Sequence, residues 1–294
     1  MTLTSRPRPR RLRGPAPSWL LLVPALGLLA AILLVPLGQS LLRSIGSPDF
    51  TLDHYTSLFT DGVTLTVLGR TAQTAVIVTV VTFLLGYPYA YLMTRVGPRM
   101  RGVLLTIVLI PFWTSVMARN FAWIILLQRG GPVQSAFEFF GAGNVVFYGS
   151  AVGVTVAMCQ VLLPFMVLPL FSSLGSIDRK LLLAARGLGS SPFVAFWKIY
   201  WPLSRGGVVS GLILVFTLSL GFYVTPALLG SPQQSLIAQL LAQRTTQLLD
   251  FAGAGALGML VLVVTLVLVA WANRFGGSIS AIGVVAAPPS KDNS

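Results

Sequence analysis

Long apolar runs alternate with short polar connections along the whole chain. A helix that crosses a membrane needs about 20 mostly apolar residues, and six runs are long enough. They cover residues 18–42, 66–92, 102–127, 147–172, 206–229 and 252–273. This pattern predicts an all-α polytopic membrane protein with six transmembrane helices. It divides the chain into a basic tail at 1–17, a six-span domain at 18–274 and a tail at 275–294.

The first apolar run follows several arginines, an arrangement that secretory signal peptides share. A signal peptide has an apolar region of about 7 to 15 residues and a cleavage site of small residues. The run at 18–42 is longer than that, and no such cleavage site stands out in it. We therefore expect it to be retained as the first span.

The distribution of charge predicts the orientation of the spans, because short cytoplasmic loops are enriched in Lys and Arg. Basic residues gather in the N-terminal tail, in the turn at 93–101, in the segment at 173–205 and after the last span. The other connections hold the acidic residues Asp49, Asp53, Asp61, Glu138 and Asp250. With six spans, this alternation predicts that both termini and the 173–205 segment are cytoplasmic.

The composition excludes several classes of protein. Only 9% of the residues are charged and 55% are hydrophobic, whereas soluble domains carry roughly 25% charged residues. The formal net charge of +13 follows the predicted topology, so nucleic acid is not an expected partner. The single Cys159 excludes an intrachain disulfide framework and a cysteine-based metal cluster, and the single His54 lies in a polar loop. We therefore expect no metal site.

The predicted spans also bear on the energy source. No Asp or Glu lies in the core of a span, which disfavours an ion-coupled secondary carrier, because such carriers commonly use an intramembrane carboxylate. That carrier is the alternative from a different functional class. No Gly-Lys pair occurs, so the chain lacks the P-loop that holds ATP phosphates. We expect a non-catalytic transport subunit without a cofactor, and if ATP drives transport, another chain binds ATP and Mg.

Arg119 is the one charged residue deep within a predicted span, and Asn120 follows it. An ionised group within a membrane is costly and is usually paired or functional. Two interpretations remain open. Arg119 either pairs with a backbone carbonyl or reaches the interface, or it lines a water-filled pathway.

A charged segment at 177–205 connects the fourth and fifth predicted spans. Asp178 is suited to cap the start of a short helix at 179–188, because its carboxylate accepts hydrogen bonds from the first free N–H groups of a helix. Gly189 would end that helix, because glycine readily adopts the left-handed conformation that follows a helix C-terminus.

A second short helix is predicted directly after the first. Ser191 is a favourable N-cap and Pro192 a favourable first helical residue. This helix would run to about Tyr200, and Pro202 would begin the approach to the fifth span. The segment is therefore expected to be a helix–turn–helix whose apolar and basic surface fits either a groove on a partner or the membrane interface.

The segment resembles the coupling loop of permeases of binding-protein-dependent ABC importers. That loop has the pattern E-A-A-x-x-x-G, followed after about nine residues by I-x-L-P. Leu183 stands in place of the glutamate and Trp201 stands in place of the leucine, whereas Ile199 follows Gly189 at the spacing of the pattern. The positions that carry the match are Ala184, Ala185, Gly189, Ile199 and Pro202.

The resemblance extends over nearly the whole chain and narrows to the spermidine/putrescine permease group. It is carried by FTLDHYTSLF at 50–59, IPFWTSVMARNFAWIILLQRGGPVQ at 110–134, LLPFMVLPL at 162–170 and GFYVTPALLG at 221–230. It implies a type I importer in the bacterial cytoplasmic membrane. Two permease subunits, expected here to form a heterodimer, would assemble with two ATPase subunits and a periplasmic or lipoprotein substrate-binding protein. ATP-driven closure of the ATPases would expose the pathway alternately outward and inward.

The resemblance also implies roles for particular residues. Ala184, Ala185 and Gly189 would dock on the ATPase, and Arg186 would supply polar contacts where the glutamate is missing. The pathway candidates are Trp113, Thr114, Arg119, Asn120, Tyr223 and Thr225. The implied substrate is a polyamine. The spans offer aromatic faces but no carboxylate for a cation, so an opine, an organophosphonate or an amino-acid-like solute is the alternative.

Overall fold

The computed structural model describes residues 22–46, 51–141 and 147–276. Within these ranges every regular element is helical. The predicted tail at 1–17 and residues 277–294 lie outside the described residues. The elements are α1 (Val23–Ser44), α2 (Asp53–Thr60), α3 (Gly62–Arg95), α4 (Pro98–Trp113), α5 (Val116–Leu127), α6 (Pro132–Phe139), α7 (Ala151–Gly175), α8 (Arg179–Gly187), α9 (Pro192–Ala195), the π-helix η2 (Phe196–Tyr200), α10 (Trp201–Leu220), α11 (Val224–Leu229), the 3-10 helix η3 (Pro232–Gln234), α12 (Ile237–Thr246) and α13 (Phe251–Gly276).

Five helical runs of the described residues are long and apolar enough to cross a membrane. They are α1, α3, α7, the run Phe193–Leu220 and α13. α4 and the helices that follow it make a sixth candidate, which is bent. The prediction of an all-α polytopic membrane protein is therefore confirmed, with spans that differ from the expected ones in two places.

The prediction of a third span formed by a single helix at 102–127 is wrong. α4 and the run Val116–Phe139 are bent by 99° relative to each other. Thr114 and Ser115 lie at the bend with ψ angles of 141° and 135°, which are extended values that no α-helix contains. Pro111 lies one turn earlier and has no N–H to donate to the helix.

The fifth span, expected at 206–229, differs at both ends. Its helix is already formed at Phe193, because α9, η2 and α10 follow one another without a break. It stops at Leu220, and the residues up to Leu229 form the separate short helix α11. The second short helix of the 177–205 segment therefore continues directly into the membrane-spanning one.

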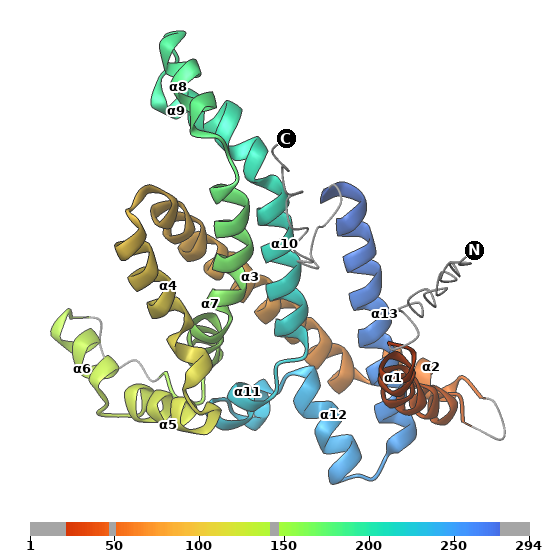
Figure 1. The fold of residues 1–294 in the computed structure, drawn as a ribbon. Helices are drawn as coiled ribbons and strands as arrows, with labels where there is room; N and C mark the ends of the chain where they lie inside the picture. The colour runs from red at the N-terminus through yellow and green to blue at the C-terminus, as the bar shows by residue number, and fades with distance from the viewer. Residues whose placement is uncertain (1–21, 47–50, 142–146, 277–294) are drawn as a thin grey trace, which may run out of the picture.

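α3, α7 and α10 pack against one another at the centre of the fold (Figure 1). Met166 of α7 is fully buried between the other two helices. A Cβ added to Gly86 of α3 would lie 2.9 Å from the Met166 Cγ, and one added to Gly211 of α10 would lie 2.8 Å from its Sδ. The two glycines therefore permit the close helix approach that stabilises membrane bundles.

A second apolar core joins α2, the first turns of α3, α12 and α13. Asp61 caps α3, because its carboxylate accepts from the N–H groups of Val63 at 3.0 Å and Thr64 at 3.3 Å. Arg244 of α12 forms an ion pair with the same carboxylate at 3.3 Å. This ion pair links the start of the second span to α12, which lies in the connection that precedes the last span.

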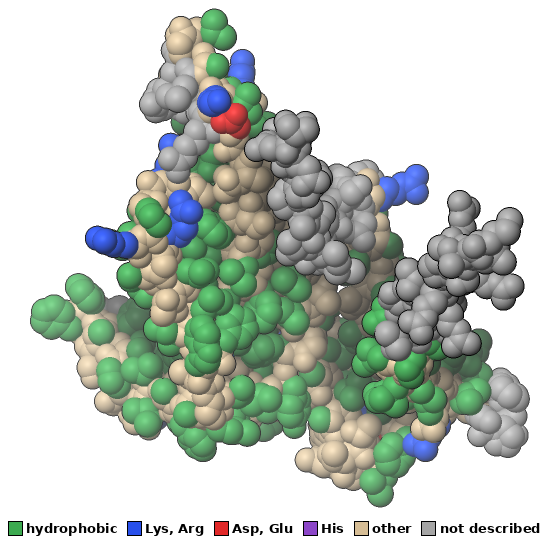
Figure 2. Space-filling view, viewed as in Figure 1, with side chains coloured by type: hydrophobic (Ala, Val, Ile, Leu, Met, Phe, Trp, Pro, Cys, Tyr) green, Lys and Arg blue, Asp and Glu red, His purple; other side chains and the backbone are tan. Residues whose placement is uncertain are grey.

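α8 and α9 project beyond the ends of α7 and α10, at the top of Figure 1. The turn between α3 and α4 and the last turns of α13 lie toward the same end of the molecule. Figure 2 shows Lys and Arg side chains at this end, over the projecting segment and the start of α4. The basic connections therefore gather on one side of the bundle.

Candidate functional site

The first helix of the projecting segment has well-defined ends. The Asp178 carboxylate accepts a hydrogen bond from the Lys180 N–H at 2.9 Å, as expected for a helix cap. At the other end Gly189 has a φ of +80°, and the Ser190 N–H donates to the Ala185 carbonyl oxygen at 3.0 Å. This is the Schellman arrangement, in which a left-handed residue closes the helix. The expected stop at Gly189 is confirmed.

The second helix begins as predicted and ends differently. The Ser191 hydroxyl accepts from the Val194 N–H at 3.3 Å, so Ser191 caps α9. The expected end near Tyr200 is wrong, because the chain continues through η2 into α10. In η2 the Trp201 N–H donates to the Phe196 carbonyl oxygen, five residues earlier. Pro202 follows within the first turn of α10, where its missing N–H leaves the helix intact.

The coupling motif runs from the tip of the projecting segment, which holds Ala184, Ala185 and Gly189, to its base, where Ile199 lies in η2 and Pro202 in α10. Ala184, Gly189 and Pro202 are exposed, whereas Ala185 and Ile199 are half-buried. The side chains of Leu183 and Arg186 lie outside the described part of the chain. The tip is also apolar, because the Leu188 side chain is 89% exposed and the Phe193 side chain 73% exposed. Apolar side chains with this exposure at the end of a projection are typical of an interaction surface.

An aromatic cluster connects the base of the projecting segment to α3. Tyr200 meets Tyr91 with ring centroids 5.2 Å apart, and Phe196 meets Tyr87 at 6.2 Å. The Tyr87 hydroxyl lies 3.1 Å from the Ser204 hydroxyl of α10. The sequence analysis did not identify this cluster. The available signal was the spacing of Tyr87 and Tyr91, which places both on one face of the second span.

Arg119 turns back across the bend between α4 and α5. Its guanidinium donates to the Thr114 carbonyl oxygen at 3.0 Å, to the Thr114 hydroxyl and to the Pro111 carbonyl oxygen. A helix C-terminus has carbonyl groups without intrahelical partners, and Arg119 donates to the Pro111 carbonyl of α4 and to the Thr114 carbonyl directly after it. Of the two interpretations left open by the sequence, the structure supports pairing with backbone carbonyls.

The other pathway candidates are partly brought together. α5, which carries Asn120, packs against α11, which carries Thr225, and both side chains are buried. The Asn120 amide donates to the Val116 carbonyl oxygen at 2.8 Å. Trp113 and Tyr223 are instead 76% and 46% exposed. The structure thus places the two polar candidates within the packed helices and the two aromatic ones at its surface.

Comparisons with known proteins agree with this architecture. The spermidine/putrescine transport system permease protein PotB of Escherichia coli K12 is 32% identical over 228 residues, covering 76% of this chain and 82% of the relative. The Haemophilus influenzae protein of the same name is 29% identical over 259 residues, covering 86% and 89%. A probable sulfate transport system permease protein of Chlorokybus atmophyticus is 28% identical over 200 residues, covering 67% and 69%.

Among solved structures, a chain of a bacterial ABC transporter involved in the import of the acidic polysaccharide alginate superposes with a TM-score of 0.70. It shares 18% identity and covers 88% of this chain and 94% of its own length, which shows the same fold. The family model described as "binding-protein-dependent transport system inner membrane component" matches residues 83–279, a range that includes the projecting segment, α7, α10 and the last part of α3. This chain therefore belongs to the family of binding-protein-dependent ABC importer permeases.

Proposed function

We propose that this chain forms part of the solute pathway of an ATP-driven importer, as a multi-pass subunit of the bacterial inner membrane. A second, non-identical permease subunit would complete the pathway. A binding protein would deliver the solute on the outer side. Two ATPase subunits, which would bind ATP and Mg, would dock on the side that carries α8. Family membership and the gathering of basic connections at that end support this arrangement.

The observation that carries the proposal is the unbroken path from the projecting segment into the central helices. α8 is joined through Gly189 to α9, and α9 continues through η2 into α10 without a break. α10 in turn packs against α3 and α7. A rigid element of this kind transmits a displacement of its tip to its far end. Movement of α8 by an ATPase would therefore tilt α10 and rearrange the helices around the pathway.

The contact with the ATPase would rely on apolar burial. Leu188 and Phe193 are the most exposed apolar side chains of the tip, and Ala184 offers a shallow surface beside them. Leu183 cannot form the charged contact that the family glutamate provides. A groove with apolar walls on the ATPase would accept this tip.

Cysteine cross-linking tests the assembly. In a variant whose buried Cys159 is replaced by Ala, a cysteine at Leu188 is expected to form a cross-link to the co-expressed ATPase. A cysteine at Phe140, which is equally exposed but lies after α6 at the other end of the molecule, is the control. Cross-linking to the ATPase from Phe140→Cys, and not from Leu188→Cys, would reverse the proposed orientation.

We propose a polyamine as the solute. The support is similarity to the two PotB proteins, which are named for spermidine and putrescine. Two aromatic candidates, Trp113 and Tyr223, expose ring faces that attract cations. The one cation nearby, Arg119, directs its donors at the carbonyls of α4.

Uptake measurements test the substrate. Proteoliposomes that hold the complete transporter, with its binding protein outside, are expected to accumulate radiolabelled putrescine when ATP is enclosed. Unlabelled spermidine should compete, and a hydrolysis-deficient ATPase should abolish accumulation. Uptake of an opine, an organophosphonate or an amino acid, without uptake of putrescine, would overturn the polyamine assignment and leave the importer assignment intact.

A further inference from the structure

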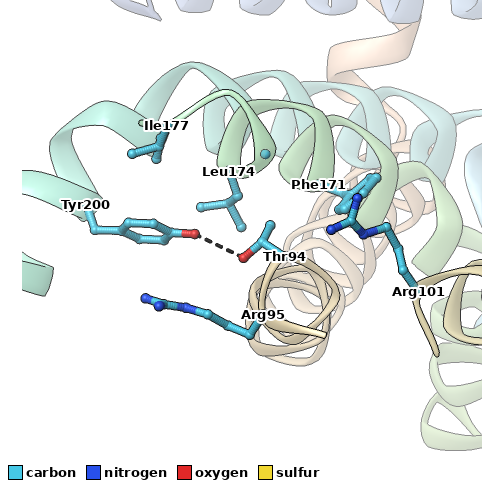
Figure 3. A pocket seen from close by; sticks show the side chains of 8 residues that line it. Thr94, Arg95, Arg101, Phe171, Leu174, Ile177 and Tyr200 are labelled. Carbon is cyan, nitrogen blue, oxygen red and sulfur yellow. Dashed lines mark hydrogen bonds between the residues drawn. The ribbon is translucent and has the colours of Figure 1, made fainter. Parts of the chain in front are cut away.

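A small pocket lies at the base of the projecting segment, where three spans end. Its volume is about 90 Å³, compared with roughly 10–15 Å³ of the same measure for one water molecule. Figure 3 shows Thr94 between the side chains of Arg95 and Arg101, with the Tyr200 ring on the side of Arg95. The lining residues come from the end of α3, the start of α4, the end of α7, the connection that follows α7, and η2: Thr94, Arg95, Arg101, Phe171, Leu174, Gly175, Ile177 and Tyr200.

The pocket carries two positive charges without a matching negative one. The Arg95 guanidinium donates to the Tyr91 hydroxyl at 2.7 Å, and the Arg101 guanidinium donates to the Met93 carbonyl oxygen at 3.2 Å. Each guanidinium has five N–H donors, so most of them remain available. Within the described residues neither arginine forms an ion pair with a carboxylate. The site is therefore electrostatically suited to an anion.

The pocket is lined by apolar side chains and by two hydroxyl groups. Leu174 is buried, and the Phe171 ring lies beneath the Arg101 guanidinium, 5.9 Å from its centroid. The Thr94 and Tyr200 hydroxyls lie 3.4 Å apart within the same wall. A ligand with a charged head and an apolar remainder matches both parts of this lining.

The depth of the pocket identifies the source of such a ligand. Arg95 is the last residue of α3, and Arg101 lies in the first turn of α4. α3 is long and apolar enough to span a membrane, and α4 is the first part of the bent sixth candidate. The end of α3 and the start of α4 therefore lie at the level of the lipid headgroups. Basic pockets between helices on the cytoplasmic side bind phospholipid headgroups. The ligand that meets this site from the membrane is a lipid phosphate.

We propose that this pocket binds the phosphate of an anionic phospholipid of the cytoplasmic leaflet. The bound headgroup would hold the ends of α3, α4 and α7 against η2, and thereby brace the base of the projecting segment. Binding would raise the rate of coupled ATP hydrolysis in membranes rich in anionic lipid. The placement of the pocket rests on the orientation under the proposed function, whereas its chemistry does not depend on the transported solute.

Lipid retention tests the proposal directly. The complete transporter is reconstituted in nanodiscs of phosphatidylcholine with or without phosphatidylglycerol, re-extracted, and examined by native mass spectrometry. The double variant Arg95→Gln/Arg101→Gln is expected to bind phosphatidylglycerol roughly 30-fold more weakly, since each basic residue at an anionic surface contributes about fivefold. Arg99→Gln, which removes an exposed arginine of the same turn that does not line the pocket, should lose no more than about fivefold.

Two further experiments separate the possible sources of the anion. Inorganic phosphate added to phosphatidylcholine discs should not restore the ATPase rate that phosphatidylglycerol supports; restoration would show a free-anion site and overturn the lipid assignment. A photoreactive phosphatidylglycerol should label the α3–α4 turn of the wild-type protein, a readout that needs no variant. Labelling of another part of the protein would contradict the proposal. A cross-link from this turn to an ATPase carboxylate would contradict it as well. Lipid retention is measured without solute, so its outcome is independent of whether polyamine uptake succeeds.

Discussion

The Arg119 guanidinium of α5 donates a hydrogen bond to the Thr114 carbonyl oxygen at 3.0 Å, across the 99° bend in the third span. The same group also reaches the Pro111 carbonyl oxygen and the Thr114 hydroxyl. The Arg119 side chain thus donates hydrogen bonds to carbonyl oxygens that, in a continuous helix, would accept from backbone N–H groups of the next turn. Because water is scarce in the bilayer, a bend of this kind needs such partners.

Removing Arg119 should therefore destabilise the bend. Arg119→Ala removes a donor from the Thr114 carbonyl oxygen and leaves the Pro111 carbonyl oxygen with the Thr114 hydroxyl, and a hydrogen bond to a charged group contributes roughly 1.5–3 kcal/mol. We expect a lower midpoint in thermal unfolding of the purified protein in detergent. Arg129→Ala removes an exposed arginine with no hydrogen bond or ion pair among the described residues and serves as the control. Equal midpoints for the two variants would contradict the capping role.

Neighbouring glycines in α10 provide a matched pair for the helix packing. A Cβ at Gly207 would lie 2.4 Å from the Ser173 Cβ and 2.8 Å from the Pro169 carbonyl oxygen, so part of the clash is with backbone. A Cβ at Gly206 would meet nothing within 4 Å. Gly207→Ala is expected to cost about 1–3 kcal/mol through overpacking, whereas Gly206→Ala should be neutral or stabilising. Unfolding of both variants in mild denaturant checks the difference, and similar losses would argue against the packing of α7 on α10.

The projecting segment contains a second pair of glycines with different requirements. Gly189 has a φ of +80°, and Gly187 lies in α8 without a positive φ; neither has a neighbour within 4 Å of an added Cβ. Gly189→Val therefore strains only the backbone, by about 1–2 kcal/mol, which disrupts the turn between α8 and α9. We expect ATP-dependent uptake to fall sharply with normal membrane insertion. Gly187→Ala should preserve uptake, because alanine favours a helix.

Asparagine separates backbone strain from loss of the glycine itself. Because asparagine tolerates the left-handed conformation better than valine does, Gly189→Asn should retain much more uptake than Gly189→Val. If both variants lose uptake equally, the glycine matters for contact with a partner rather than for the turn.

The stability contributed by Asp61 should depend on pH. Hydrogen bonds from the Thr64 hydroxyl and the Val63 N–H, with the nearby Arg244, hold the pKa of Asp61 below its ordinary value of 3.8. The ionised form is thus favoured in the folded state, and its stabilisation is present above that ordinary value and is lost as the pH falls through the folded pKa. We expect Asp61→Asn to unfold at a lower temperature than wild type near neutral pH, with the gap closing in acid.

Asp53→Asn is the control for that measurement, because the Asp53 carboxylate makes no hydrogen bond or ion pair within the described residues. Its midpoint should follow that of the wild type at every pH. A gap for Asp61→Asn that stays constant down to strongly acidic pH would show that shape rather than charge stabilises the start of α3. Asp61→Ala, which removes the cap altogether, should cost about 1 kcal/mol.

The features that depend only on residues close together along the chain were predictable from the sequence. Apolar length predicted the spans, because the cost of burying polar backbone in lipid acts on each helix by itself. Gly189 and Ser191 predicted the turn between α8 and α9, because capping involves residues within one turn. The resemblance placed the coupling motif on this segment, and the structure gives it a defined shape.

Other features required contacts between distant residues. Pro111 in the apolar run at 102–127 indicates a weak point in the helix, but it does not predict a 99° bend at Thr114, since a helix breaks in a membrane only where other groups satisfy its free carbonyls. The continuation of η2 into α10 also depends on the contact of Tyr200 and Phe196 with α3.

The sequence by itself determined that the chain is helical, which runs of it are apolar enough to span a membrane, and which segment carries the coupling motif. Only the tertiary structure decided that Arg119 pairs with α4, and that Arg95 and Arg101 share a pocket with Tyr200, a hundred residues further along the chain. The reason is physical. Helix formation and membrane burial are summed over local residues, whereas a capped bend or a charged pocket exists only where separate helices bring complementary groups together.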